Sequence, residues 1–134
     1  MGVANWTPQV GTYKDLTGIA EQHFMSFLDE VCPVLGQSTA AVLSKSRRMQ
    51  LVTIRHLMMC VARYEFDLNT KSVGLLFNRD HSSVIYACKE MENKWFIYGP
   101  TFSQMQSLHA AEKIFTQIWG HKFKTVGTWR TRKK

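Results

Sequence analysis

The chain has 134 residues, of which 45% are hydrophobic and 12% aromatic, and it carries a formal net charge of +7. This length suits one domain with a hydrophobic core, and no apolar run approaches the roughly 18 residues of a transmembrane helix. We therefore expect one soluble domain without membrane contact, and the opening residues MGVANWTPQV lack the basic start and apolar run of a secretory signal, which predicts a cytoplasmic protein.

The positive charge is concentrated in two windows. Four of the 17 basic residues lie between positions 45 and 55, six follow position 120, and neither window contains an acidic residue. The rest of the chain has seven basic and ten acidic residues and is therefore mildly acidic. Segregated positive charge is typical of nucleic-acid binding, because lysine and arginine neutralise phosphates. A solvated basic face with a solubilising tail is the alternative that charge alone leaves open.

The spacing of apolar residues predicts helices along most of the chain. Residues 1–15 contain glycine and proline without a sustained period and are interpreted as an N-terminal arm. An amphipathic helix is predicted over 16–31 and is closed by Pro33 and Gly36, and a short helix follows over 39–44. The strongest apolar period of the chain predicts a third helix over 50–66.

Three further helices are predicted in the second half. Asn69 or Thr70 caps a short helix over 71–77, Asp80 caps a helix that reaches about position 97, and the stretch TFSQMQSLHAAEKIFTQIWG forms a sixth. Neither alternating strands nor a repeat is evident, so the predicted fold is all-α, a bundle of about six helices. The expected organisation is, in chain order, an arm at 1–15, a domain over 16–119 and a basic tail over 120–134.

Metal, cofactor and catalytic chemistry are not indicated. The three cysteines lie in apolar helical patterns without a C-x-x-C pair, so buried free thiols are predicted at Cys32, Cys60 and Cys88. The five histidines show no zinc spacing, and neither a metal nor a cofactor is expected. Asp80 and His81 are adjacent, but neighbouring helical side chains point about 100° apart and no nucleophile is placed by spacing, so we expect no enzyme.

The predicted fourth and fifth helices are joined by about three residues, NRD, around Asn78, a residue that tolerates a left-handed backbone. Short helix, tight turn and longer helix is the pattern of a helix-turn-helix, although any helical hairpin shares it. In a helix-turn-helix the first residues of the second helix meet base edges in the major groove. Those residues here are His81, Ser82 and Ser83. Arg79 would contact a phosphate or brace Asp80.

The stretch NRDHSSVIYACKEM resembles the signature of the C-terminal DNA-binding domain of the bacterial chromosomal replication initiator DnaA, a pattern close to G-G-R-D-H-T-T-V-L-H-A-C-R-K-I. The identical positions are Arg79, Asp80, His81, Val84, Ala87 and Cys88. The resemblance extends backward without a gap through LSKSRRMQLVTIRHLMMCVARYEFDLNTKSVG and covers roughly residues 16–97. It implies a helix-turn-helix of the Trp-repressor type and double-stranded DNA as the partner.

In that family a basic loop enters the minor groove while the recognition helix reads the adjacent major groove. The resemblance implies that Lys45 and Arg47 are the loop contacts, with Arg47 in the minor groove. Arg55 would contact a phosphate or a guanine edge, and Asp80 could accept a hydrogen bond from a cytosine amino group. The complete set of expected DNA-binding residues is Lys45, Arg47, Arg48, Arg55, His56, Lys71, Arg79, Asp80, His81, Ser82, Ser83, Tyr86 and Lys89.

This sequence departs from the family pattern at several of these positions. The serine pair Ser82 and Ser83 replaces two threonines, which removes the methyl groups that can pack on thymine. His56 replaces a glutamine, Asn78 replaces two glycines, and Lys71 replaces a proline and could add a phosphate contact. Alternative interpretations stay open for three of the expected side chains: a second helix cap for His81, a partly exposed aromatic for Tyr86, and ordinary surface charge for Arg48.

The function that follows from the resemblance is sequence-specific binding of double-stranded DNA, at a site related to the initiator's A/T-rich nonamer, in replication initiation or its regulation. The chain contains no G-x-x-x-x-G-K-[ST] phosphate loop, so the initiator's ATPase core is absent from it. We expect a free-standing DNA-reading module of a phage, mobile element or bacterium. It would lie at the nucleoid, or in the host cytoplasm if phage-encoded.

Two other functions are compatible with the sequence. The chain could be an adaptor that binds a replication or host protein through its C-terminal helix and tail, with an exposed aromatic surface made by Trp119, Phe123 and Trp129. The tail HKFKTVGTWRTRKK, which mixes aromatic and basic residues, could instead stack on the bases of single-stranded nucleic acid. A disordered basic tail is the plainer interpretation of the same residues.

Overall fold

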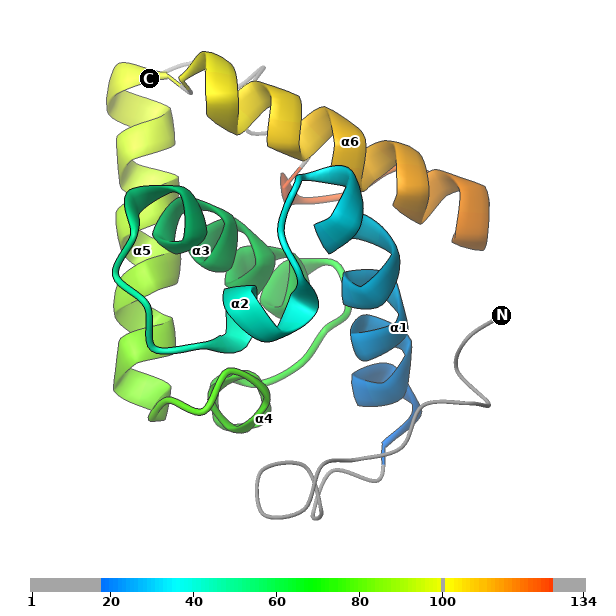
Figure 1. Cartoon of the computed structure of the whole chain (residues 1–134), viewed down its shortest axis with the longest axis horizontal. Coiled ribbons are helices and arrows are strands. Elements are labelled where there is room, and N and C mark those ends of the chain that lie inside the picture. The colour runs from blue at the N-terminus through cyan, green and yellow to red at the C-terminus, as the bar shows by residue number, and fades with distance from the viewer. Residues whose placement is uncertain (1–17, 100, 127–134) are drawn as a thin grey trace.

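The computed structural model describes residues 18–99 and 101–126, with the backbone alone at 96–98 and 102. Within these residues the chain forms six α-helices and no strand, which confirms the predicted all-α fold (Figure 1). The helices are α1 (Ile19–Val34), α2 (Thr39–Leu43), α3 (Met49–Tyr64), α4 (Thr70–Leu76), α5 (His81–Tyr98) and α6 (Phe102–Trp119). The proposed arm at 1–15 and the residues after 126 lie outside the described part.

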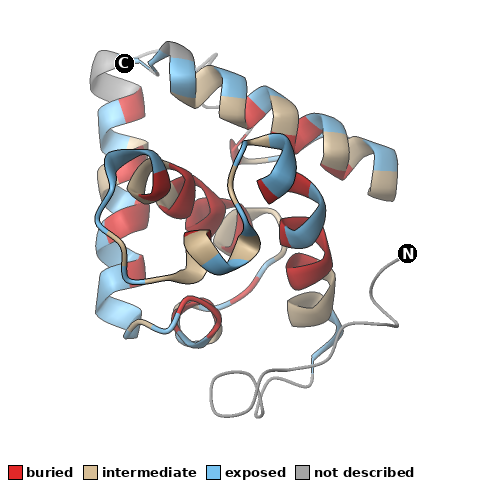
Figure 2. Ribbon diagram, in the orientation of Figure 1, coloured by how far each residue is buried: buried red, intermediate tan, exposed pale blue. Residues whose placement is uncertain are grey.

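Helix α3 is the centre of the bundle. It packs against α2, α4, α5 and α6, while α1 packs against α2 and α6. Figure 1 shows α5 upright along one side, α6 crossing its C-terminal end toward α1, and α4 at the opposite end of α5. Buried residues in Figure 2 line the inner faces of these helices. Helix α3 accordingly has a buried stripe at three- and four-residue spacing: Leu51, Ile54, Leu57, Met58 and Val61.

Short polar side chains define where four helices begin. The hydroxyl of Ser38 accepts a hydrogen bond from the backbone N of Ala41 at 3.0 Å, and the Asn69 side chain accepts from Ser72 N at 2.8 Å. The Asp80 carboxylate accepts from Ser83 N at 3.0 Å, which confirms the predicted cap of α5. Helix α6 begins with a capping box at Thr101. Each contact satisfies a backbone N–H that the helix itself leaves unpaired.

The first helix ends later than predicted. Pro33 lies inside the last turn of α1 and does not terminate it. Proline removes one N–H donor and crowds the carbonyl four residues earlier, but its fixed φ is compatible with a helical turn, and the helix continues through Val34. Gly36, with a φ of +81°, then reverses the chain, and its N–H donates to the Pro33 carbonyl at 3.0 Å.

The inward face of α5 consists of Val84, Cys88, Met91 and Trp95, which are all buried. The sulfur atoms of the three cysteines are free, and all three residues lie in the hydrophobic core. Within the described ranges 18–99 and 101–126, no helix is both long enough and apolar enough to cross a membrane.

A cluster of aromatic rings joins α1, α6 and the segments that follow α3 and α6. Phe27 is fully buried at its centre, with its ring centroid 5.4 Å from that of Phe66 and 6.1 Å from that of Phe115. Trp119 and Phe123 lie 6.3 and 6.4 Å from Phe27 in the same cluster. Such tilted and edge-to-face pairs add to the free energy gained by burying the rings.

The described part of the C-terminal segment is docked on the bundle. The Glu65 carboxylate, just beyond α3, accepts hydrogen bonds from the backbone N of Lys124 at 2.7 Å, of Thr125 at 2.8 Å and of Val126. Phe123 is 5% exposed. The expectation that Phe123 belongs to an exposed aromatic surface or a base-stacking tail is therefore wrong. The hydrogen bonds from residues 124–126 to Glu65 hold the backbone beside Phe123 against the bundle, and its ring lies in the core. Trp119 is partly buried, and Trp129 lies outside the described residues.

The turn between α4 and α5 depends on Asn78 and Gly74. Asn78 has a φ of +55°, the left-handed conformation expected at that position. The Gly74 carbonyl accepts from Arg79 N at 2.7 Å, and a Cβ atom on Gly74 would lie 2.5 Å from the Arg79 carbonyl oxygen. The turn can therefore pass this close to α4 only because residue 74 lacks a side chain.

Gly74→Ala should lower the free energy of unfolding by about 1–3 kcal/mol, because the new methyl group must push the backbone of the turn away from α4. Urea unfolding followed by circular dichroism measures the change. Ser72→Ala, in the same short helix, is the matched control. Equal unfolding midpoints for Gly74→Ala and the wild-type protein would contradict the close approach.

Candidate nucleic-acid interface

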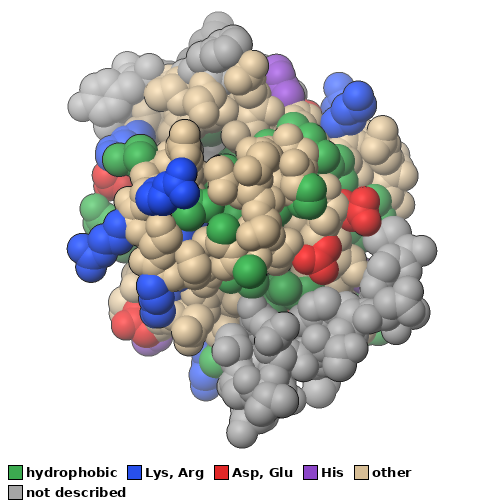
Figure 3. Space-filling view, viewed as in Figure 1, with side chains coloured by type: hydrophobic (Ala, Val, Ile, Leu, Met, Phe, Trp, Pro, Cys, Tyr) green, Lys and Arg blue, Asp and Glu red, His purple; other side chains and the backbone are tan. Residues whose placement is uncertain are grey.

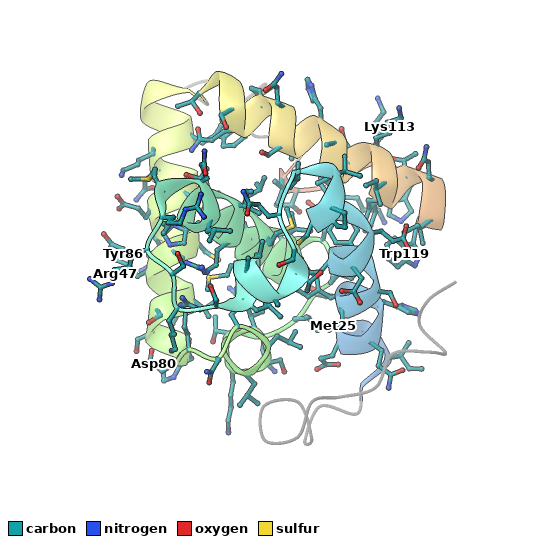
Figure 4. All side chains as sticks on the ribbon, in the orientation of Figure 1. Met25, Arg47, Asp80, Tyr86, Lys113 and Trp119 are labelled. Atoms are coloured by element: carbon teal, nitrogen blue, oxygen red, sulfur yellow. The ribbon has the colours of Figure 1, made fainter. Side chains whose placement is uncertain are left out.

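The tip of α5, which we define as His81, Ser82 and Ser83, is exposed on the surface. Its backbone is held by the Asp80 cap and by the turn that passes over Gly74. Figure 4 shows Asp80 at the free end of α5, away from α6. The three side chains of the tip therefore project from a fixed helix end, where unpaired N–H groups and partial positive charge favour anions.

The outer face of α5 continues this exposed surface for two more turns. Tyr86 is 64% exposed, and Lys89 is exposed as well. Ile85 is 39% exposed on the same helix, and it was absent from the expected DNA-binding set. Its position, three residues after Ser82, could have signalled it, because residues three and four apart share a helical face. An exposed isoleucine is a suitable apolar contact for a thymine methyl group.

The basic loop, which we define as residues 44–48, connects α2 to α3. Arg47 and Arg48 are exposed, and the Arg48 side chain donates to the Gln50 amide oxygen at 3.4 Å. Two local hydrogen bonds shape the loop: the Ser44 hydroxyl accepts from Ser46 N at 3.2 Å, and the Ser46 hydroxyl accepts from Arg48 N at 3.3 Å. Such serine-to-backbone bonds fix a turn.

A groove of about 740 Å³ runs between the basic loop, α3 and the start of α5. Arg47 lines this groove together with Asp80, Ser82, Ser83 and Tyr86. Figure 4 shows Arg47 and Tyr86 on the same edge of the molecule, with Asp80 farther along α5. Lysine and arginine side chains gather on this side in the space-filling view of Figure 3. The structure thus brings the exposed arginine of the loop and the polar start of α5 onto one surface.

Arg55 is not an exposed contact residue. Its side chain is 3% exposed, and it donates from Nε to the Val42 carbonyl at 2.7 Å and from Nη1 to the Ser46 carbonyl at 3.0 Å. Arg55 is therefore bonded to the Val42 carbonyl in α2 and to the Ser46 carbonyl in the basic loop, and its expected contact with a phosphate or guanine edge stays a prediction. Its Nη2 atom is buried and has no hydrogen-bond partner among the described residues.

Arg79 and Lys45 are also bonded to backbone carbonyl groups. Arg79 donates from Nη1 to the Phe77 carbonyl at 2.7 Å and from Nη2 to the Ser44 carbonyl at 3.0 Å, so it does not brace Asp80. Lys45 donates from Nζ to the Asn78 carbonyl at 2.7 Å while remaining exposed. The sequence indicated positive charge at these positions but not the carbonyl partners.

The groove between the basic loop and α5 is lined by the buried Arg55 and the partly buried Arg79, and burial disfavours their positive charge. Burial lowers the pKa of Arg55, and the neighbouring Arg79 cation lowers it further. Burial also lowers the pKa of Arg79. Both groups nevertheless remain cations, since arginine does not lose its proton in proteins. These two adjacent cations repel each other and are partly removed from water. An anion bound nearby would offset both costs.

Two further groups of the groove, His56 and Asp80, have defined protonation states at neutral pH. Burial lowers the pKa of His56, and the Arg55 and Arg79 cations lower it further, so His56 is a neutral imidazole. The Ser83 backbone N–H holds the pKa of the exposed Asp80 carboxyl below its usual range, so Asp80 is ionised. His56 can therefore offer a hydrogen bond but not a charge, and Asp80 can only accept.

Lys71 is an exposed residue near the start of α4, as expected for a side chain that could reach a phosphate. Beyond Tyr86 a second groove of about 1020 Å³ extends between α3, α5 and α6. Its lining consists mostly of neutral polar and apolar side chains, and its two charged residues, Glu90 and Lys94, form an ion pair at 2.8 Å. The basic groove and this neutral groove share His56, Val52 and Tyr86 on their border.

Comparison with known proteins identifies what this arrangement resembles. Residues 26–91 match the family model described as the bacterial dnaA protein helix-turn-helix. The chain is 31% identical over 87 residues to the chromosomal replication initiator protein DnaA of Bacteroides thetaiotaomicron, covering 64% of this chain and 18% of that protein. The corresponding protein of Bacteroides fragilis is 29% identical over 68 residues, covering 50% of this chain and 14% of the relative.

A third relative, from Thermodesulfovibrio yellowstonii, is 32% identical over 65 residues, or 48% of this chain and 15% of its own length. The chain thus spans less than a fifth of the curated relatives it matches. No solved structure shows significant similarity to it. The matched segment extends from the middle of α1 to α5 and therefore contains the basic loop, the turn and the tip of α5.

Proposed function

Because this chain belongs, through residues 26–91, to the bacterial DnaA helix-turn-helix family, we propose that it binds double-stranded DNA at a specific sequence and acts in replication initiation or its regulation. The observation that carries the proposal is the shared groove in which Arg47 meets the polar start of α5. A minor-groove arginine and a major-groove helix must lie on one face to bind one duplex.

In the proposed complex, the tip of α5 enters the major groove and Arg47 enters the adjacent minor groove. The exposed tip supports this arrangement, because an α-helix fits the major groove and reads bases with its first residues. His81 and the two serine hydroxyls can donate or accept at base edges, and the ionised Asp80 can accept from a cytosine amino group. The lost threonine methyl groups would be partly replaced by the exposed Ile85.

The electrostatics of the groove support an anionic ligand. Arg55 and Arg79 are partly desolvated cations side by side, and the Nη2 atom of Arg55 has no partner within the described ranges. A DNA phosphate nearby would stabilise both cations, and releasing counterions from the duplex adds sequence-independent affinity. Binding in this proposal involves no catalysis, and its site of action is the nucleoid.

The proposal is tested by selecting duplexes from a random library with the wild-type protein and titrating the selected duplex by fluorescence anisotropy. A scrambled duplex of the same composition, at the same salt concentration, is the control. We expect tighter binding to the selected sequence. Equal affinity for the two duplexes would remove the claim of sequence specificity, and no binding to either would remove DNA binding altogether.

His81→Ala should weaken binding to the selected duplex by about 1–3 kcal/mol while leaving the scrambled duplex nearly unaffected, because a base contact carries sequence information and a phosphate contact does not. Anisotropy titrations of both duplexes measure the two effects. His109→Ala, an exposed histidine on α6, is the matched control. An equal loss on both duplexes would make His81 a phosphate contact.

A further inference from the structure

Two segments that are more than 30 residues apart in the chain are joined by cation-to-carbonyl bonds. Arg79 spans them: one guanidinium nitrogen donates to the Ser44 carbonyl of the basic loop and the other to the Phe77 carbonyl of the turn. Lys45 crosses in the opposite direction, from the loop to the Asn78 carbonyl at 2.7 Å. The basic loop and the turn before α5 are therefore joined by two side chains, one from each segment.

The same loop is held from α3. The Arg55 guanidinium donates to the carbonyl groups of Val42 and Ser46, on either side of the Ser44 carbonyl that Arg79 binds. Alternate carbonyl groups at 42, 44 and 46 are thus each bonded to an arginine. The next residue, Arg47, remains exposed at the end of this fixed stretch.

We propose that Arg79 is a positioning residue: it fixes the basic loop relative to the turn so that Arg47 and the tip of α5 engage adjacent grooves of one duplex in register. This inference rests on the proposed DNA binding. It assigns Arg79 an indirect role in reading the minor groove, although Arg79 precedes the helix that reads the major groove.

The chemistry of the side chain favours this role over a simple phosphate contact. Both Nη atoms of Arg79 already donate to carbonyl groups, and burial makes the guanidinium costly to leave unbonded. A guanidinium has donors in a rigid planar fork and can join two carbonyl groups at once, whereas a lysine ammonium is a compact point charge on a flexible stem. The position therefore requires arginine and not merely a positive charge.

Loss of this tie should affect one part of DNA recognition selectively. Without it the loop gains conformational freedom, which must be lost again when Arg47 enters the minor groove. The tip of α5 keeps its Asp80 cap and the packing of α5 on α3 and α4. Discrimination between base pairs should therefore fall in the minor-groove half of the site and persist in the major-groove half.

The test uses Arg79→Met, which removes the donors, and Arg79→Lys, which keeps the charge, in the full chain. Affinities are measured for the library-selected duplex and for two derivatives, one with G·C pairs substituted in the minor-groove half and one with changed bases in the major-groove half. For both variants we expect the ratio of the affinity for the selected duplex to that for the G·C-substituted duplex to fall about tenfold. Lys113→Met, which removes an exposed cation from α6, outside the expected DNA-binding set, is the matched control.

A double-mutant cycle with Arg47→Ala adds an independent criterion. If Arg79 acts through Arg47, removing Arg47 should cost little once Arg79 is methionine, and the two losses will not add. Additive losses would overturn the proposal. So would a loss in Arg79→Met that is equal on all duplexes and restored by Arg79→Lys, which is the behaviour of a phosphate contact.

Hydrogen exchange in the free protein separates this inference from the proposed function. In Arg79→Met the amides of residues 44–48 should exchange faster, while those of α1 and α6 stay protected. Unchanged exchange in the loop would overturn the positioning role even if the protein binds DNA. A wild-type protein without sequence preference would instead overturn the proposed function and, with it, the role assigned here. If Arg79→Met does not fold, Lys45→Met must show a smaller change in the same direction, and an unaltered preference would contradict the proposal.

Discussion

Arg47→Ala should reduce affinity for the selected duplex by about 1–3 kcal/mol, or roughly 5- to 150-fold, and abolish the preference for A·T pairs in the minor-groove half of the site. Arg47 is exposed at the end of a loop whose carbonyl groups are bonded on both sides, so little of its binding energy is lost in ordering the backbone. The narrow minor groove of A·T-rich DNA concentrates negative potential, which arginine can enter.

Anisotropy titrations over a range of salt concentrations measure the affinity and the number of phosphates neutralised. Arg48→Ala, the neighbouring exposed arginine, is the control. We expect Arg48→Ala to weaken all duplexes by similar factors, as a phosphate contact does. If Arg47→Ala showed the same uniform loss, with the A·T preference intact, then Arg47 would not lie in the minor groove.

Phe27→Ala should lower the free energy of unfolding by about 3–5 kcal/mol, the range for removing a buried aromatic side chain. Phe27 is fully buried, and its ring contacts rings from α1, α6 and the segments that follow α3 and α6. Deleting it leaves a cavity between elements that cannot all move inward together. The loss is a large fraction of the total stability of a domain, which is typically about 5–15 kcal/mol.

Urea unfolding of Phe27→Ala and of the wild-type protein, followed by far-ultraviolet circular dichroism, measures this difference. The urea concentration at the midpoint should fall while the slope of the transition stays the same. Ile19→Ala, at the 65% exposed first position of the same helix, should change the free energy of unfolding by no more than about 0.5 kcal/mol. Similar small shifts for both variants would show that the aromatic cluster contributes little to stability.

The helices could be predicted from the sequence because their signals are local. Apolar periodicity located α3 and α5, and the aspartate before His81 marked the start of α5. The tip of α5 followed from the pattern of a short helix, a tight turn and a longer helix. Only the ends of the elements differed, as at Pro33, whose ring is compatible with a last helical turn.

The hydrogen bonds that hold the basic loop could not be predicted in the same way. Sequence gives the charge of Arg55, Arg79 and Lys45, but their carbonyl partners lie up to 35 residues away, and a basic side chain looks the same whether it binds phosphate or backbone. The docking of residues 124–126 on Glu65 spans 59 to 61 residues and likewise has no local signal. Long-range hydrogen bonds of this kind require the tertiary structure.

The aromatic cluster also limits how this protein can be dissected. Phe27 and Phe66 belong to the segment that matches the family, whereas Phe115, Trp119 and Phe123 lie beyond its end. A fragment cut at 26 and 91 would keep every expected DNA-binding residue yet lose three of these five rings. We therefore expect residues 26–91 alone to be less stable than the whole chain, because the final helix supplies part of their core.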